Sequence, residues 1–328
     1  MPAPRQRITV RTTSTSHVDS NPQQVIYNPN SNRKRKLFLL TVVALFVTGT
    51  VIIVFNWQTV STATPIAVNE FEEYIHITFP NAVMFESGQS YLTSDSRELI
   101  DSLAKILVQY PNHRIVIHGH STNIPRFGDL FSLTRPYQYS SNIHLSVARA
   151  ASVAVHLIYH HGFDPILIES VGMGEFRPID TNSTPEGRAN NRRVDVFVFP
   201  PVDDEIEVYR HFFLPLIFEL DRSRLSAFGR EMIDNMASIL AQYPNYRIVI
   251  HGHTDNMPVG VNSWYPSNIH LSATRAASVA VYLIYHHGFD PILIESVGMG
   301  KFRPIYTNNT PEGRANNSRV EILVFPQS

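Results

Sequence analysis

Two kinds of apolar pattern alternate along residues 74–199. Short runs rich in β-branched residues predict strands at 74–85, 114–119, 166–171 and 193–199, and apolar residues three and four positions apart predict helices at 94–110 and 142–161. Residues 185–191 predict a short turn or helical segment. The order is βαβαβ followed by a closing strand, and two amphipathic helices can cover one face of such a four-stranded sheet. We therefore predict a two-layer α/β sandwich.

The same pattern occurs a second time along the chain. The stretch SNIHLSVARAASVAVHLIYHHGFDPILIESVGMG at 141–174 returns at 267–300 with few substitutions, which means that one folding unit is present twice. Strands at 208–218, 247–252, 292–297 and 319–325 and helices at 225–243 and 268–287 complete the second unit. We predict two tandem domains, copy one at 74–199 and copy two at 208–328, with linkers at 58–73 and 200–207.

An uncharged apolar segment precedes both copies. It begins at Leu37, ends at Trp57 and is long enough, at about 1.5 Å per residue, to cross the ~30 Å core of a bilayer. Basic residues at 33–36 flank only its N-terminal side, which predicts a cytoplasmic tail at 1–36 and both copies across the membrane. A cleaved signal peptide, whose apolar region is normally shorter, and a buried core helix are the alternatives. We predict a retained single-pass anchor.

Composition narrows the classes of function. Hydrophobic residues make up 43% and charged residues 17%, as in a folded globular protein, and the absence of cysteine excludes disulfides, thiolate metal sites and thiol nucleophiles. The net charge is −1, but the first 36 residues hold seven basic residues and one acidic residue, so the two copies are mildly acidic. That balance argues against nucleic acid as a partner. The catalytic patterns GxSxG, HExxH and GxxxxGK are absent, and we do not expect an enzyme.

Charged residues gather where the second strand of copy two ends. Thr254 and Asp255 follow this strand, and the next helix opens with Asn268 and carries Arg275 about two turns in. Open α/β sheets bind ligands at this end of their strands. An aspartate and an arginine facing one cleft suit a zwitterion, because the carboxylate accepts from an ammonium group and the guanidinium pairs with a carboxylate. The alternative is a turn-forming aspartate and a solvated helix arginine.

Four motifs occur in order in copy two: GHTDN, SNxxLSxxRAxSVxxYL, GxDPxxIxSVGxGxxRP and TPEGRAxNxRVEI. They resemble the OmpA-like peptidoglycan-binding domain, most of all the version at the C-terminus of flagellar stator B subunits, and the resemblance extends over both copies. It implies a periplasmic domain that binds the cell wall non-covalently through the diaminopimelate of a stem peptide. It also implies that Asp255 and Arg275 bind this ligand, with Thr254 and Asn268 shaping the rim of the site.

Copy one departs from this pattern where the ligand would bind. Thr122 stands at the position of the aspartate, although Arg149 and Asn142 are retained, and the loop that follows is seven residues longer than in copy two. A hydroxyl cannot supply the charge-assisted bond that a carboxylate gives to an ammonium group. Copy one is therefore expected to bind weakly, to bind something else or to act as a spacer. In copy two, Ser318 replaces an arginine of the family pattern, a change to which we give little weight.

Histidine pairs suggest metal binding as an alternative. His118 and His120 lie two positions apart on one strand, as do His251 and His253 in copy two, but each pair lacks an evident third ligand. The pairs at 160–161 and 286–287 lie at helix C-termini, where positive charge is favourable, and we interpret them in that way. No metal ion and no cofactor is predicted.

These features predict a single-pass protein of a bacterial inner membrane whose periplasmic domains bind peptidoglycan and tether the membrane, or an envelope complex, to the cell wall. One alternative is an envelope scaffold or secretion-system component whose domains bind proteins. Another is a stator-B-like motor subunit, but proton conduction requires a carboxylate within the membrane helix, and residues 37–57 contain none. Gly49, among threonines of the span, is compatible with a homodimer.

Overall fold

The computed structural model describes residues 9–11, 67–71, 74–80, 84–86, 88–124, 139–201, 204–205, 210–215, 217–219, 222–261 and 263–326. The predicted membrane span at 37–57 lies outside these ranges. None of the helices within them combines the length and the apolarity that a membrane span requires.

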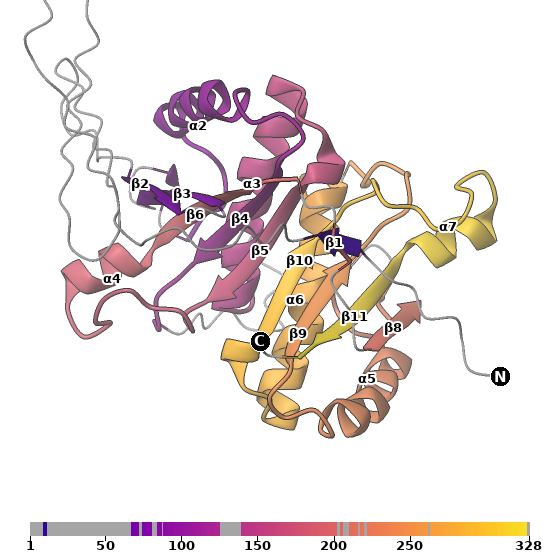
Figure 1. Ribbon diagram of the computed structural model, residues 1–328. Helices are drawn as coiled ribbons and strands as arrows, with labels where there is room; N and C mark the ends of the chain where they lie inside the picture. Colours follow the sequence, from indigo (N-terminus) through magenta and orange to yellow (C-terminus); the bar gives the residue numbers. More distant parts are fainter. Residues whose placement is uncertain are drawn as a thin grey trace, which may run out of the picture.

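Nine strands of the described chain form one mixed sheet in the order β2-β3-β6-β4-β5-β10-β9-β11-β8 (Figure 1). Copy one supplies β3 (Tyr74–Pro80), β6 (Arg193–Phe199), β4 (Arg114–His120) and β5 (Ile168–Gly174). Strand β2 (Ala67–Phe71) lies in the segment expected to be a linker at 58–73, and it pairs with β3 at the edge of the sheet. Copy two supplies β10 (Ile294–Gly298), β9 (Arg247–Gly252), β11 (Arg319–Phe325) and β8 (Arg210–Pro215). Separately, β1 (Thr9–Arg11) pairs with β7 (Asp204–Glu205).

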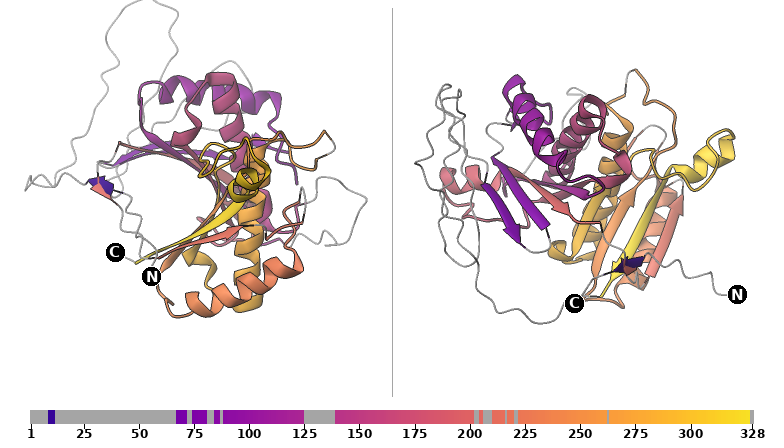
Figure 2. Two further views of the ribbon diagram at one scale, coloured as in Figure 1. Left: turned by 90° about the vertical axis from the view of Figure 1, so that its right-hand side faces the viewer. Right: turned by 45° about the horizontal axis from the view of Figure 1, so that its top comes forward.

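Four long helices lie on one face of this sheet (Figure 2). They are α2 (Ser94–Leu107) and α3 (Asn142–His161) in copy one, and α5 (Ala227–Leu240) and α6 (Asn268–His287) in copy two. The short helices α4 (Pro185–Asn191) and α7 (Pro311–Asn317) precede the closing strands. The α/β sandwich and the order of its elements are as predicted. The structure adds a 3-10 turn before β5 and another before β10, at Pro165–Leu167 and Pro291–Leu293.

Local sequence explains where α3 and α6 begin and end. The side chains of Ser141 and Ser267 accept hydrogen bonds from backbone N–H groups of the first turn of each helix, which would otherwise lack partners. Gly162 and Gly288 end the helices with φ angles of 70° and 71°, a left-handed conformation that glycine adopts at no steric cost. The repeat thus encodes both ends of each helix in the same way.

The two copies share a sheet, which the sequence did not predict. Strands β5 and β10 pair antiparallel, with Val171 opposite Val297, and these two residues occupy equivalent positions in the repeat. Two copies of one unit that meet through the same elements form an isologous interface, the kind found in symmetric dimers. The chain therefore contains a pseudo-dimer with its two halves in covalent sequence.

Helices α3 and α6 extend this interface beside the sheet. Apolar side chains pack between them, with Ile143, Val147 and Ala151 from one helix and Ile269, Ala273 and Ala277 from the other. Two hydrogen bonds cross the interface as an equivalent pair: His144 Nε2 to Ser278 Oγ, 3.0 Å, and Ser152 Oγ to His270 Nε2, 3.0 Å. Each copy also has its own core beneath its helices. Residues of the opposite face, among them Val116, Val249 and Leu323, form a separate buried cluster.

Candidate functional site

Asp255 lies in a turn directly beyond the carboxyl end of β9. Its Oδ1 accepts the backbone N–H of Met257 at 2.8 Å, and its Oδ2 accepts the hydroxyl of Ser318 at 3.0 Å. The Ser318 Oγ in turn accepts the backbone N–H of Asp255 at 3.2 Å. The carboxylate is half-buried, and these two bonds leave it further acceptor sites. The sequence interpretation gave Ser318 too little weight, because its side chain contacts the carboxylate of Asp255, which is the predicted ligand-binding group.

Asn268 and Thr254 support the same turn from below. The side-chain amide of Asn268 donates to Met257 O at 2.9 Å and to Asp255 O at 3.4 Å, so it fixes the turn to the start of α6. Thr254 is 4% exposed, and its backbone N–H donates to Gly300 O at 3.0 Å. Thr254, which was expected at the rim of the site, is therefore buried in the structure.

Arg275 is buried against the segment that precedes α5. Its Nε donates to Arg222 O at 3.0 Å, and its guanidinium carbon lies 5.1 Å from the centre of the Phe218 ring. Only 9% of the residue is exposed. The sequence suggested a solvated helix arginine as one alternative, and burial excludes that alternative. These contacts fix the Arg275 guanidinium against the segment around Arg222.

The loop before α6 contributes residues that the sequence did not single out. The Arg222 guanidinium stacks 4.7 Å from the ring of Trp264, which is partly exposed, and the Tyr265 hydroxyl donates to Ser223 Oγ at 2.7 Å. In the sequence, an arginine and an aromatic residue on these two loops would have been the signal for this contact. Two open hollows, about 360 and 260 Å³ in volume, lie elsewhere, beside Phe213 and Arg319. Asp255 and Arg275 line neither of them.

Copy one repeats the framework with different chemistry at its surface. Arg149 Nε donates to Gln89 O at 2.9 Å, as Arg275 does to the equivalent residue of copy two. Asn142 donates to Ile124 O at 3.0 Å and accepts from Ser121 Oγ at 3.1 Å. Thr122, at the position of Asp255, is 4% exposed. The backbone arrangement is therefore retained where the carboxylate has been lost.

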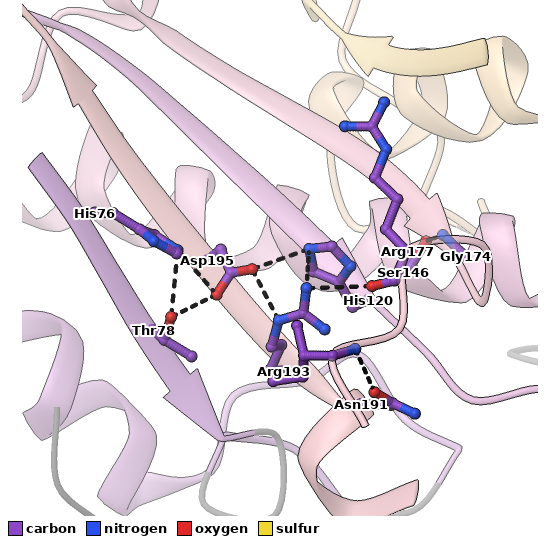
Figure 3. A network of polar contacts seen from close by, with 10 residues as sticks. His76, Thr78, His120, Ser146, Gly174, Arg177, Asn191, Arg193 and Asp195 are labelled. Atoms are coloured by element: carbon purple, nitrogen blue, oxygen red, sulfur yellow. Dashed lines mark hydrogen bonds and ion pairs between the residues drawn. The ribbon is translucent and has the colours of Figure 1, made fainter. Parts of the chain in front are cut away.

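A buried ionic network lies on the sheet below each site, and Figure 3 shows the one in copy one. Asp195 on β6 accepts from Thr78 Oγ1 at 2.7 Å and from Arg193 Nε at 2.9 Å, and it lies 3.1 Å from His120 Nε2. Burial opposes the ionised form of Asp195, but bonds from His120 and His76 and the Arg193 charge outweigh it and hold its pKa well below the usual range. The network fixes the ends of β4 and β6, from which the loops of the site emerge.

Copy two has an equivalent network that brings three metal-ligating groups together. Ligand atoms of His251, His253 and Glu321 lie within 4.8 Å of one another. Arg319 Nε already donates to Glu321 at 2.6 Å, and burial lowers the pKa of His251 to about 3 and that of His253 to about 2. A cation here would lie beside the Arg319 guanidinium, which repels it. We interpret this cluster as structural.

The fold and these sites define a duplicated α/β sandwich with a polar turn at the carboxyl end of a central strand in each copy. The model of the OmpA family matches residues 84–192 and 217–318, and the chain belongs to that family. The resemblance inferred from the four motifs is thus confirmed, in both copies.

Similar proteins come from several bacteria. Motility protein B of Bacillus subtilis is 33% identical over 39% of this chain and 46% of its own length. The peptidoglycan-binding protein ArfA of Mycobacterium tuberculosis is 41% identical over 34% of this chain and 32% of its own length. The chain thus spans about half of these relatives or less. Among solved structures, the cell wall anchor of the T6SS from Pseudomonas aeruginosa is 30% identical over 42% of this chain and 88% of its own, with a TM-score of 0.37.

Proposed function

We propose that copy two binds peptidoglycan non-covalently and thereby tethers this protein, and the membrane in which it is anchored, to the cell wall. Asp255 would accept the ammonium group of a diaminopimelate side chain, and Arg275 would pair with the carboxylate of the same residue. Membership of the OmpA family and the relatives that are named for peptidoglycan binding support this assignment. No covalent step is involved.

The observation that carries the proposal is the way in which Asp255 is held. Its two oxygens are each fixed by one hydrogen bond, from Met257 N and from Ser318 Oγ, and Asn268 ties the turn to α6. A carboxylate fixed in this way loses little rotamer freedom when a cationic ligand binds, which favours affinity. A turn-forming aspartate alone would need only the bond to Met257 N.

Sedimentation with purified sacculi tests this proposal. The full-length chain in mild detergent should pellet with sacculi, and free diaminopimelate should release it. Asp255→Asn keeps the shape of the side chain and removes its charge, and a charge-assisted hydrogen bond contributes about 1.5–3 kcal/mol. We therefore expect Asp255→Asn to weaken binding by roughly 10- to 150-fold.

The control for this test is built into the repeat. Thr122→Ala changes the equivalent position of copy one and should leave binding within about two-fold of the unmodified chain. Arg275→Ala should also weaken binding, but burial means that circular dichroism has to show an intact fold. Equal sedimentation of the Asp255→Asn and unmodified chains would refute the assignment of Asp255. Failure of the unmodified chain to sediment would refute the tether itself.

The membrane anchor is a separate part of the proposal. The apolar segment at 37–57 with basic residues before it supports a single pass through the inner membrane, with both copies in the periplasm. Protease added to intact spheroplasts should then digest both copies and leave a fragment that contains the tail and the span. Protection of the copies from protease would contradict this orientation.

For copy one, the loss of the carboxylate favours a second function, the binding of an envelope protein. Thr122 replaces the aspartate, and the loop that follows is seven residues longer than in copy two. Loops accept insertions readily and often carry binding functions. Shortening this loop to the length found in copy two should leave sacculus binding unchanged while abolishing recovery of a cross-linked periplasmic partner. A loss of sacculus binding would instead place the loop in the wall-binding surface.

A further inference from the structure

Three potential metal ligands converge on the outer side of copy one, between α2 and α3. The Oδ1 atom of Asp101 lies 2.8 Å from His156 Nε2 and 2.7 Å from His161 Nε2. Among the described residues, these atoms form one of two groups of three ligand atoms within 4.8 Å of one another. His156 is almost fully buried, whereas Asp101 and His161 are accessible to solvent. Packing therefore holds one ligand of the cluster in place, and solvent reaches the other two.

We propose that Asp101, His156 and His161 form a binding site for a divalent transition-metal ion of the Zn²⁺ type. Two imidazole nitrogens and one carboxylate oxygen are a ligand set that Zn²⁺ accepts, with a fourth position open to water. With metal–ligand bonds of about 2 Å, tetrahedral ligand atoms lie roughly 3.3 Å apart. Each imidazole nitrogen would have to move only about half an ångström away from Asp101 Oδ1, and all three ligand atoms already lie within 4.8 Å of one another.

The surroundings of the cluster favour a cation. It lies at the last turn of α3, where the backbone carbonyl groups carry partial negative charge. The His160 ring stacks on that of His156, with ring centres 4.5 Å apart, and limits the rotation of the ligand ring. In the other group of three ligand atoms, Arg319 donates to the carboxylate. Within the described part of the chain, the side chains that contact the Asp101 carboxylate are those of the two histidines. The outer cluster is thus the more suitable of the two for a metal ion.

Copy two provides a natural control, because it lacks one of the three ligands. Asp234 and His287 occupy the equivalent positions and lie 2.9 Å apart, but Tyr282 stands where copy one has His156. This is one of few differences between the two versions of the repeat. A protonated phenol is a poor metal ligand, and burial together with the nearby Asp234 raises the pKa of Tyr282 further. Two remaining ligands do not complete the site.

The sequence interpretation assigned the histidine pair at 160–161 to favourable charge at the end of α3. The structure extends that interpretation, because His161 and His156 direct the same ring atom toward one carboxylate oxygen of α2. A bound ion would link the two helices of copy one. Copy two would be without this link, and the two halves of the pseudo-dimer would respond differently to metal.

Titration of the full-length chain, prepared without a histidine tag and freed of metal by chelation, tests the site. Calorimetry with Zn²⁺ should give one equivalent bound, and Co²⁺ should give the intense visible absorption of a tetrahedral site. His156→Tyr introduces the residue of copy two and should weaken binding by more than the roughly 10–100-fold that loss of an outer-shell partner costs. Asp101→Asn should act in the same direction.

Two further variants make the outcome decisive. Tyr282→His completes the ligand set of copy two and should raise the number of bound ions from one to two. His113→Ala removes an exposed imidazole that does not touch the cluster and should leave one ion bound. If the unmodified chain binds no metal, or if His156→Tyr binds as tightly as the unmodified chain, the site does not exist as assigned. A second ion that fails to appear in Tyr282→His would likewise refute the role given to position 156.

Discussion

Copy one and copy two differ less in their framework than in the groups that they present. Arg149 and Arg275 hold the segment before the first long helix through the same backbone contact, and Asn142 and Asn268 both fix the turn after the central strand. At the surface of that turn, however, copy two has a carboxylate held by Ser318, and copy one has a buried threonine. The substitutions thus change the chemical groups at the turn and leave the scaffold intact.

The shared interface explains why copy one keeps its fold without the aspartate. Its strand β5 covers the edge of β10, and its helix α3 buries the apolar face of α6. An uncovered sheet edge and an uncovered apolar helix face are both liabilities for a folded domain. Copy one therefore stabilises copy two structurally.

The largest expected effect on stability comes from substituting equivalent glycines in the two copies. A Cβ atom added at Gly119 would lie 1.9 Å from Ser146 O, and one added at Gly252 would lie 2.0 Å from Ser272 O. Both clashes are with helix backbone, so the strand and the helix would have to separate. We expect Gly119→Ala and Gly252→Ala each to lower the free energy of unfolding by about 3 kcal/mol, as severe overpacking does.

Urea unfolding of the full chain measures this effect and also tests the shared sheet. Because the two copies share one sheet and one helix interface, both variants should shift the same cooperative transition. Two separate transitions, of which each glycine variant moves only one, would show that the copies unfold independently.

The sequence predicted the elements of each copy more accurately than the relation between the copies. The spacing of apolar residues and the capping residues specify each helix and strand locally, so β6 and α3 have the predicted bounds. The join between β5 and β10 depends on the pairing of two identical strands, and no local pattern distinguishes a paired edge from an exposed one. The same limit applies to the site, since contacts such as that of Ser318 with Asp255 join residues 63 positions apart.

The pH dependence of stability probes the interface itself. Burial lowers the pKa of His144 and that of His270 to about 4, whereas an unfolded histidine titrates near 6.5. Between these values the unfolded chain binds a proton that the folded chain does not, so stability falls as pH falls from about 6.5 to about 4. Each of the two histidines should lower the free energy of unfolding by about 1.4 kcal/mol for every unit by which the pH falls within this interval.

His144→Gln should remove one of these contributions and make the slope of stability against pH shallower by about 1.4 kcal/mol per unit. The matched control is Ser278→Ala, which removes the hydrogen-bond partner of His144 and keeps the titrating ring. Unfolding at pH 6 and at pH 5, which both lie between the folded and the unfolded pKa values, gives both slopes. An unchanged slope in His144→Gln would contradict the burial of a neutral histidine at this interface.

Introducing an aspartate into copy one tests whether the carboxylate accounts for the difference between the two sites. In a chain that carries Asp255→Ala, the additional change Thr122→Asp should raise sacculus binding by about ten-fold, the equivalent of one weak charge-assisted bond. Thr122→Asn serves as the uncharged control and should give no recovery. If Thr122→Asp also gives none, the carboxylate is not the only feature of the wall-binding site that copy one lacks, and the longer loop becomes the next variant.

The smallest expected effect concerns the ion pairs that cross between the copies. Glu295 lies 3.0 Å from Arg177, and Glu169 lies 3.4 Å from Arg303, in equivalent positions of the repeat. Because the arginines are partly exposed, solvent screens these pairs, and double-mutant cycles should give coupling energies of about 0.2–1 kcal/mol for each. The two energies should agree within error if the interface is isologous, since both pairs then have the same environment. A clear difference between them would mean that the pseudo-symmetry seen in the backbone does not extend to the energetics of the interface.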